Sequence, residues 1–151
     1  MKIALHSELE GGINTYPEQL FDSEWYKELC ALMTDCIEGM IYFELSIILV
    51  DDERIRSLNK LYRGLSRSTD ELSFAYNEND SLESGEIYLC PAQALRQRSR
   101  FHTTKTQELA RLFFHGFLHI LGYDHDATAN RKVMRGVEDC LMRSAHSHHL
   151  W

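Results

Sequence analysis

The chain has 151 residues, of which 44% are hydrophobic and 26% charged, and its formal net charge is −7 at pH 7. These values are typical of one globular domain and exclude a disordered or fibrous protein. No apolar run approaches the roughly 20 residues of a membrane span. The N-terminal apolar stretch is too short for a signal peptide and is broken by His6 and Glu8. We therefore expect a cytoplasmic protein with no membrane partner, built as a single domain over residues 1–151.

The first half of the chain predicts alternating strands and helices. The predicted elements are a strand over Lys2–Leu5, a helix over Asp22–Glu38, a buried strand over Glu44–Val50 and a helix from Asp51 to about Tyr62. Apolar residues recur at helical spacing in the first helix, and the second strand is apolar and β-branched. Asp51 and Asp52 suit the start of the second helix, because the helix dipole favours negative charge there.

The second half predicts a hairpin followed by helices. The predicted elements are a loop over Gly64–Thr69, strands over Glu71–Tyr76 and Gly85–Cys90 with a polar turn between them, a helix from Pro91, a helix over Thr104–Leu121 and a helix over Thr128–Ala145. Thr104 and Gln107 have the spacing of a capping box, and Gly122 can end a helix. We expect residues 143–151, with three histidines, to form a flexible tail. The fold class is α/β (α+β), with a small mixed four-stranded sheet and about five helices.

Positive charge is concentrated in two short stretches despite the acidic total. Nine of the sixteen basic residues are Arg54, Arg56, Lys60, Arg63 and Arg67 in one stretch and Arg96, Arg98, Arg100 and Lys105 in the other. The net charge by itself argues against a nucleic-acid partner. An acidic protein can nevertheless have one positively charged surface that binds nucleic acid. The alternative is that both stretches are ordinary solvated surface.

The segment HGFLHILGYDH carries the strongest chemical signal in the sequence. His115 and His119 are four residues apart on a predicted helix, so both imidazoles project from one face. Gly122 can turn the chain back, and His125 can then approach the same ion. Three protein ligands leave one tetrahedral position open, which is the catalytic type of zinc site. We expect one zinc ion per chain, bound by these three histidines and used for hydrolysis.

The same histidine and glycine positions occur in the HExxHxxGxxH zinc proteases. Their general base, a glutamate, would sit at position 116, where this chain has Gly116. The ligand pattern is therefore kept while the group that activates water in peptide hydrolysis is missing. Another interpretation is that these are unrelated histidines near the end of a helix.

The segment also resembles the HGxLHxxGYDH signature of the YbeY family of rRNA maturation endoribonucleases. The resemblance extends upstream, where Asn59–Arg63 and Thr69–Phe74 resemble the family pattern NxxxR…TDVLSF, and Gly85–Cys90 resembles GDIxIC. Met134 and Glu138 fall where the last helix of the family often has similar residues. There are departures: Glu71 replaces a usual apolar residue, Ala75 stands where proline is common, and Glu86 replaces aspartate.

The resemblance implies a zinc-dependent endoribonuclease that hydrolyses single-stranded RNA. It implies action in small-subunit rRNA 3′-end maturation and ribosome quality control, with the small ribosomal subunit and its proteins as partners. The histidines at 115, 119 and 125 would hold the metal, and Arg63 would be a catalytic residue that steadies a phosphate. Glu138 and Asp124 are each open to a role in orienting a ligand or to a purely structural one.

Two other classes of function stay open on the sequence alone. A zinc peptidase or amidase fits the ligand spacing but lacks a base at position 116. A ribosome assembly factor with structural zinc fits the resemblance without catalysis. The RNA bond that is cleaved, the proton-transfer groups, a substitute divalent metal and the oligomeric state are open as well.

Overall fold

The computed structural model describes residues 2–9, 23–34, 42–64, 71–78, 81–101, 103–124 and 126–151. The elements in these ranges are β1 (Lys2–Leu9), α1 (Ser23–Leu32), β2 (Tyr42–Leu49), α2 (Asp52–Arg63), β3 (Glu71–Glu78), β4 (Ser81–Leu89), α3 (Pro91–Phe101), α4 (Lys105–Ile120) and α5 (Thr128–Ser147). The predicted mixed α/β class with five helices is confirmed for the described part of the chain.

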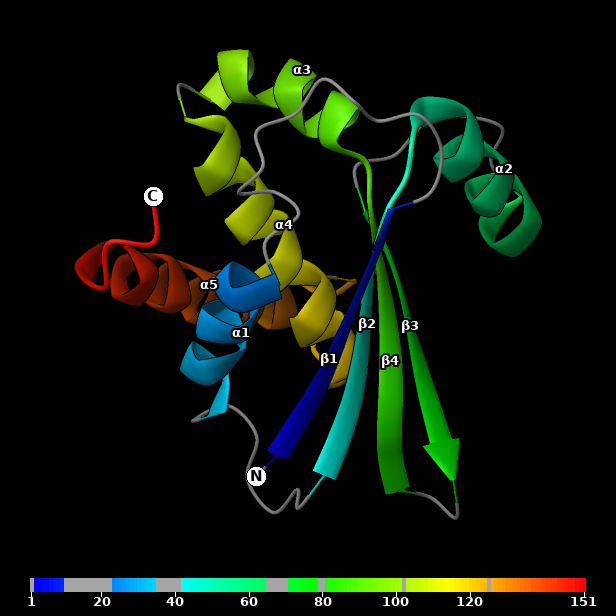
Figure 1. Ribbon diagram of the computed structural model, residues 1–151, viewed down its shortest axis with the longest axis horizontal. Coiled ribbons are helices and arrows are strands. Elements are labelled where there is room, and N and C mark those ends of the chain that lie inside the picture. Colours follow the sequence, from blue (N-terminus) through cyan, green and yellow to red (C-terminus); the bar gives the residue numbers. More distant parts are fainter. Residues whose placement is uncertain are drawn as a thin grey trace.

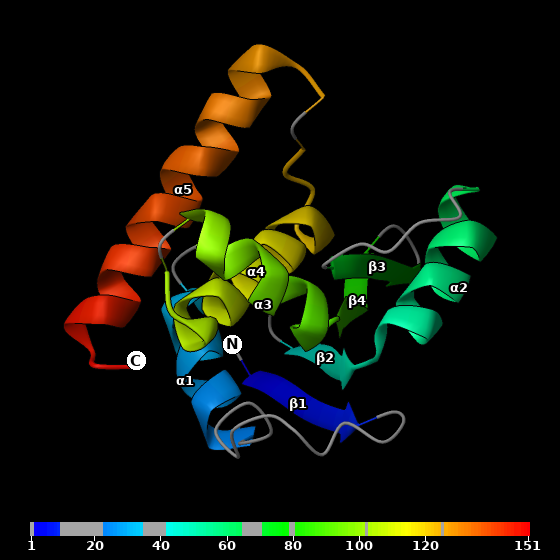
Figure 2. The same ribbon diagram turned by 90° about the horizontal axis from the view of Figure 1, so that it is seen from above.

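The strands form one mixed sheet in the order β1-β2-β4-β3 (Figure 1). β1 and β4 both run parallel to β2, whereas β3 pairs antiparallel with β4 and forms one edge of the sheet. Seen from above, α1, α4 and α5 cover one face of the sheet and α2 lies on the opposite side (Figure 2). The structure is therefore layered, with α4 packed between the sheet and α5.

The main core fills the space between the sheet and the α1–α4–α5 layer. Phe43, Leu45 and Ile47 alternate along β2 and are almost fully buried there. α4 contributes Phe113, Phe114 and Phe117, whose side chains are completely buried. A smaller cluster under α2 covers the other face and is formed by Ile48, Val50, Ile55, Leu58, Leu72 and Cys90. Since α4 has its apolar side fixed by this core, its polar side is fixed as well.

α2 begins and ends where the sequence predicts. Asp51 is its N-cap and accepts a hydrogen bond from the Arg54 amide at 2.7 Å. Gly64 follows the helix with φ 69°, the left-handed conformation that glycine adopts without strain. Asp52 also pairs with Arg96 on α3, so the first turn of α2 is joined to α3.

The hairpin is longer than predicted. β3 continues to Glu78 and β4 begins at Ser81, so both strands extend into the stretch that we expected to be a polar turn. Ladder pairing persists across a register shift between Tyr76 and Asn77. The expectation failed because the backbone of this ladder supplies its own hydrogen bonds, whatever the polarity of the side chains. The loop predicted over Gly64–Thr69 lies, apart from Gly64, outside the described residues.

The expected flexible tail is also corrected. α5 runs to Ser147, and beyond it Leu150 is only 8% exposed and packs on the core. The Trp25 indole nitrogen donates a hydrogen bond of 2.7 Å to the Leu150 carbonyl. The chain turns back through His149, which has φ 57°, and the Leu150 amide bonds to the Ala145 carbonyl at 3.1 Å. Residues 143–151 are mostly polar, so their composition predicted a loose end. Leu150 and Trp151 nevertheless pack against the core, and this contact depends on α1, which is distant in the sequence.

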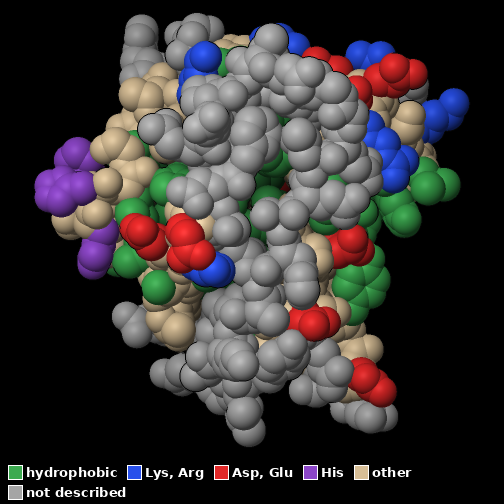
Figure 3. Space-filling view, viewed as in Figure 1, with side chains coloured by type: hydrophobic (Ala, Val, Ile, Leu, Met, Phe, Trp, Pro, Cys, Tyr) green, Lys and Arg blue, Asp and Glu red, His purple; other side chains and the backbone are tan. Residues whose placement is uncertain are grey.

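Histidines gather where α5 ends. His146, His148 and His149 are exposed there, at the edge of the face seen in Figure 3.

None of the described helices is both long enough and apolar enough to cross a membrane.

Candidate metal centre

The centre is built on the last turns of α4. A capping box fixes the start of this helix: the Gln107 amide donates to Thr104 Oγ1 at 3.1 Å, and the Thr104 amide donates to Gln107 Oε1 at 2.9 Å. From that start, the helical repeat places His115 and His119 on the same face. Their Nε2 atoms lie 3.1 Å apart. The predicted convergence of these two imidazoles is therefore present.

The other nitrogen of each ring is engaged by an acceptor. His115 Nδ1 bonds to Glu138 Oε2 on α5 at 3.0 Å, and His119 Nδ1 bonds to the Tyr123 carbonyl at 3.1 Å. The Tyr123 carbonyl can only accept, so His119 Nδ1 carries the hydrogen, and the Glu138 carboxyl group is the partner of His115 Nδ1. With their Nδ1 atoms engaged in this way, the two rings turn their Nε2 atoms toward each other. Histidines that bind a metal through one ring nitrogen usually donate the hydrogen of the other nitrogen to a carboxylate or a carbonyl, and both kinds of partner are present here.

The turn after α4 supplies the acceptor for His119. Gly122 has φ 98°, as predicted for the residue that ends the helix. The Tyr123 amide donates to the Leu118 carbonyl and the Gly122 amide to the His119 carbonyl, both at 3.0 Å. This pair of bonds is a Schellman motif, and it folds the Tyr123 carbonyl back over the His119 ring. The glycine therefore places the acceptor of the His119 ring as well as ending the helix.

The donor set fits a zinc ion. Two imidazoles bound at about 2.05 Å in a tetrahedral site would have nitrogens about 3.3 Å apart, and the Nε2 separation here is 3.1 Å. Two nitrogens this close share either a proton or a metal ion. Within the described ranges no group of three His, Cys, Asp or Glu side chains meets at one point. His125, the third predicted ligand, lies outside those ranges, so the full ligand set stays a prediction.

A network of charged side chains surrounds His115. Arg111, one turn earlier on α4, pairs with the buried Glu108 and, at 3.4 Å, with Glu138. Burial lowers the pKa of His115, but the hydrogen bond and charge of Glu138, followed by the charge of Glu71, outweigh burial and raise that pKa overall. Glu138 thus has the orienting role that the sequence left open, because it holds His115 and links it to Arg111.

Two site residues were missed by sequence reasoning. Arg111 and His115 are four residues apart on one helix, a spacing that could have indicated their proximity. Glu71 lies 45 positions before Gly116, on β3, and only the sheet packing brings it to α4. A pocket of about 400 Å³ opens beside His115 between α4 and α5, and it is lined partly by Arg111, Arg131 and Arg135.

Gly116 faces β3 at close range. A Cβ atom built on it would lie 2.8 Å from Glu71 Oε1 and 3.1 Å from Ile87 Cγ2. The side-chain space that a protease glutamate would use at this position is therefore occupied. Any side chain at position 116 would have to displace the end of Glu71 and press on Ile87, so glycine suits the packing here apart from any reason connected with the chemistry.

We expect one substitution to have opposite effects at two helical glycines. Gly116→Ala should lower the free energy of unfolding by about 1 kcal/mol, because overpacking of about 1–3 kcal/mol exceeds the helix-propensity gain of about 1 kcal/mol. Gly136→Ala on α5 should raise it by up to about 1 kcal/mol, since nothing lies within 4 Å of the added atom. Urea unfolding of the two variants measures both values. Stabilisation by Gly116→Ala would contradict the described packing.

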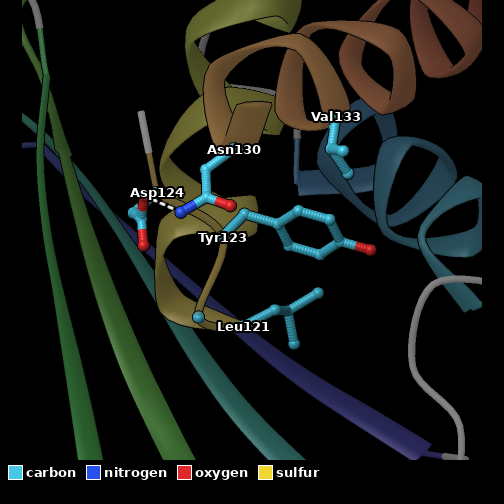
Figure 4. Close-up of a pocket in the computed structure, with 6 residues that line it drawn as sticks. Leu121, Tyr123, Asp124, Asn130 and Val133 are labelled. Atoms are coloured by element: carbon cyan, nitrogen blue, oxygen red, sulfur yellow. Dashed lines mark hydrogen bonds between the residues drawn. The ribbon is translucent and has the colours of Figure 1, made fainter. Parts of the chain in front are cut away.

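Asp124 belongs to the turn between α4 and α5. Its Oδ1 accepts from the Asn130 side chain at 3.1 Å (Figure 4). It also accepts from the Asp126 amide at 3.3 Å. These contacts support the turn-capping alternative. The adjacent pocket of about 260 Å³ is lined by the turn and by Asn130 and Val133, and it does not include either histidine.

The structure places Arg63 as the last residue of α2, and its side chain lies outside what the structure describes. Arg54, Arg56 and Lys60 are exposed on the same helix. Arg96 on α3 is held beside them by its pair with Asp52. The two basic stretches are thus adjacent at this point, while Arg67 and the side chains of Arg98 and Arg100 fall outside the described part.

The fold and the site define a class of mixed α/β protein, in which a helix ending in a glycine turn presents two histidines beside an edge strand. The chain belongs to the family described as Endoribonuclease YbeY, whose sequence model matches residues 14–146. The Endoribonuclease YbeY of Desulforamulus reducens is 40% identical over 107 residues, covering 66% of this chain and 70% of the relative. That of Heliobacterium modesticaldum is 32% identical over 168 aligned positions, covering 100% and 99%.

A solved structure shares the fold. The solution structure of a Thermotoga maritima protein has a TM-score of 0.60 and 25% sequence identity, and the match covers 97% of this chain and 95% of that one. The family resemblance found in the sequence between Asn59 and Glu138 is confirmed by the family model, which matches residues 14–146.

Proposed function

We propose that the chain is a zinc-dependent endoribonuclease that hydrolyses phosphodiester bonds in single-stranded RNA. The observation that carries this proposal is the His115–His119 pair, whose Nε2 atoms face each other at 3.1 Å. Relatives with the name Endoribonuclease YbeY support RNA as the substrate. The family resemblance further supports a place in small-subunit rRNA maturation, in the cytoplasm, with ribosomal partners.

His115, His119 and His125 would hold the metal. When bound, zinc supplies a Lewis acid for a phosphate oxygen and lowers the pKa of a coordinated water. The protein's own contribution is orientation. Glu138 and the Tyr123 carbonyl fix the two rings so that no reorganisation is needed when the ion is bound.

Recognition of RNA would fall to cations on α2 and at the start of α3. A phosphodiester is negatively charged, and its charge grows during hydrolysis, which suits a guanidinium such as that of Arg63. The exposed cations of α2 and the start of α3 would follow the backbone of the RNA by charge alone. Gly116 leaves the chain without the glutamate base of the zinc proteases, so peptide hydrolysis is disfavoured.

A paired assay tests the proposal. Metal-loaded protein is given a single-stranded RNA and a casein substrate, each with and without chelator. Cleavage of the RNA alone, lost with chelator and restored by zinc, is the expected result. Cleavage of casein alone would show a peptidase. Cleavage of neither, with tight binding to the small subunit or its rRNA, would show an assembly factor.

A further inference from the structure

A pocket of about 400 Å³ lies between α4 and α5, the helices that pack together over one face of the sheet (Figure 2). Its wall on α4 is formed by Glu108, Arg111 and His115, which recur at helical spacing on one side of that helix. Glu108 and His115 are two turns apart, so this wall is about 10 Å long. The α4–α5 pocket therefore extends from the first turn of α4 to the first of the predicted metal ligands.

The wall on α5 combines apolar and charged side chains. Arg131, Arg135 and Asp139 follow one another at four-residue spacing and are exposed at the mouth of the pocket. Met134 lines the pocket between the two arginines and is only 2% exposed. A methionine side chain is polarizable and adapts its shape to the group that it contacts. The pocket thus offers apolar surface inside and guanidinium groups at its mouth.

The charges in the pocket favour an anion at the mouth. Two of its carboxylates are engaged inside, because Glu108 pairs with Arg111, and Glu138 pairs with Arg111 at 3.4 Å and with His115 at 3.0 Å. At the mouth, two guanidinium groups lie on the same helix face as one carboxylate, that of Asp139. Arg135 has no ion-pair partner among the described side chains. Its guanidinium can therefore bind an anion without breaking an ion pair.

A buried hydroxyl group also lacks a partner here. Thr103 lines the pocket just before α4, and its Oγ1 is buried with no hydrogen-bond partner among the described residues. Buried polar groups are ordinarily satisfied, and a hydroxyl can both donate and accept. A polar ligand in the pocket would supply the partner.

The lining suits a nucleotide better than a lone anion. A nucleotide has a flat base for the apolar surface, a phosphate for the guanidinium groups and further polar atoms for the hydroxyl. The volume of about 400 Å³ lies within the range of small-molecule sites. The pocket also shares His115 with the candidate metal centre, so a nucleotide next to the phosphodiester at that centre can reach it.

We propose that the α4–α5 pocket binds one nucleotide of the single-stranded RNA, next to the bond that is cleaved. Arg135 and Arg131 contact its phosphate, Met134 contacts its base, and Thr103 bonds to one of its polar atoms. The inference rests on the proposed function, for which it defines a substrate subsite.

Binding of uridine 5′-monophosphate to the full-length chain tests the subsite without any cleavage step. Titration followed by the backbone amide signals in NMR gives both the Kd and the residues that are perturbed. We expect perturbations along α5 and the first half of α4. Arg135→Ala should raise the Kd about tenfold, since a hydrogen bond to a charged group is lost. Arg135→Lys keeps the charge without the planar fork and should raise it less.

Lys132→Ala is the matched control. Lys132 is exposed on the same turn of α5, but it is not one of the residues that line the pocket. The variant removes an equal charge from the same helix, so the Kd for the nucleotide should not change.

Three further ligands identify what the pocket takes. Inorganic phosphate and uridine should each bind more weakly than the monophosphate, because each fills only part of the pocket. A short single-stranded oligouridylate should displace the monophosphate. Equal binding of inorganic phosphate would show a simple anion site, and failure of the oligonucleotide to compete would show a site for free nucleotides. Either result overturns the inference.

The remaining outcomes separate this subsite from the nuclease assignment. Perturbations confined to elements other than α4 and α5, wild-type affinity in Arg135→Ala, or an equal loss in Lys132→Ala also overturns the inference. Chelator-sensitive RNA cleavage without nucleotide binding at α5 refutes the subsite alone. An Arg135-dependent subsite from which the oligonucleotide displaces the nucleotide, in a protein that cleaves no RNA, refutes the nuclease alone.

Discussion

Replacing His115 by alanine is expected to remove zinc binding and RNA cleavage together. The substitution deletes one of two nitrogens that face each other at 3.1 Å and leaves Glu138 without a ring to orient. Loss of an outer partner already costs about 10–100-fold in metal affinity, so loss of a ligand should cost more than about 100-fold. Metal content of the purified protein and chelator competition measure the affinity, and RNA cleavage is measured on the same samples.

His146→Ala is the control for this experiment. His146 is exposed near the end of α5, in the group of histidines seen at the edge of Figure 3. Its removal should leave one tightly bound zinc per chain and unchanged cleavage. Tight zinc binding that survives His115→Ala but disappears in the control would place the metal at the end of α5 and contradict the centre on α4.

Replacing Arg63 by glutamate is expected to abolish RNA cleavage while zinc stays bound. Removal of one group that stabilises charge in a transition state costs about 10²–10³ in kcat, and reversal of its sign should cost at least as much. A substitution at the end of α2 leaves the α4 histidines and their partners intact. Single-turnover cleavage of RNA and zinc content, determined on one preparation, give the two quantities.

Lys60→Glu separates catalysis from general attraction. Lys60 is exposed three residues earlier on the same helix, and the charge reversal is the same. If it only contacts the RNA backbone, KM should rise and the salt dependence of binding should weaken, with kcat unchanged. A loss of zinc in Arg63→Glu, or equal effects of the two variants on kcat, would refute the assigned role of Arg63.

The local signals in the sequence were reliable where short-range chemistry controls structure. The capping box at Thr104 and Gln107, the helix start at Asp51 and Asp52 and the left-handed Gly122 are all present as predicted. Each depends on contacts within a few residues. The His115–His119 pair is in the same category, because the four-residue spacing on a helix is sufficient to bring the rings together.

Predictions failed where a distant partner decides the structure. The polar stretch after Tyr76 continues the ladder because β4 offers it backbone partners. The C-terminal residues are ordered against Trp25, which is 125 positions away from Leu150. Neither interaction leaves a local pattern, so composition alone favoured a turn and a loose tail.

At the site, the two imidazoles, their spacing, the glycine turn and the absence of a glutamate at 116 can all be read from the sequence. The groups that bond to the second nitrogens, Glu138 from α5 and the folded-back carbonyl of Tyr123, become visible only in the folded chain. The same holds for Glu71, which fills the space over Gly116. Helix geometry fixes neighbours up to one turn away, whereas Glu71 and Glu138 come from a strand and from another helix, which reach α4 only through packing.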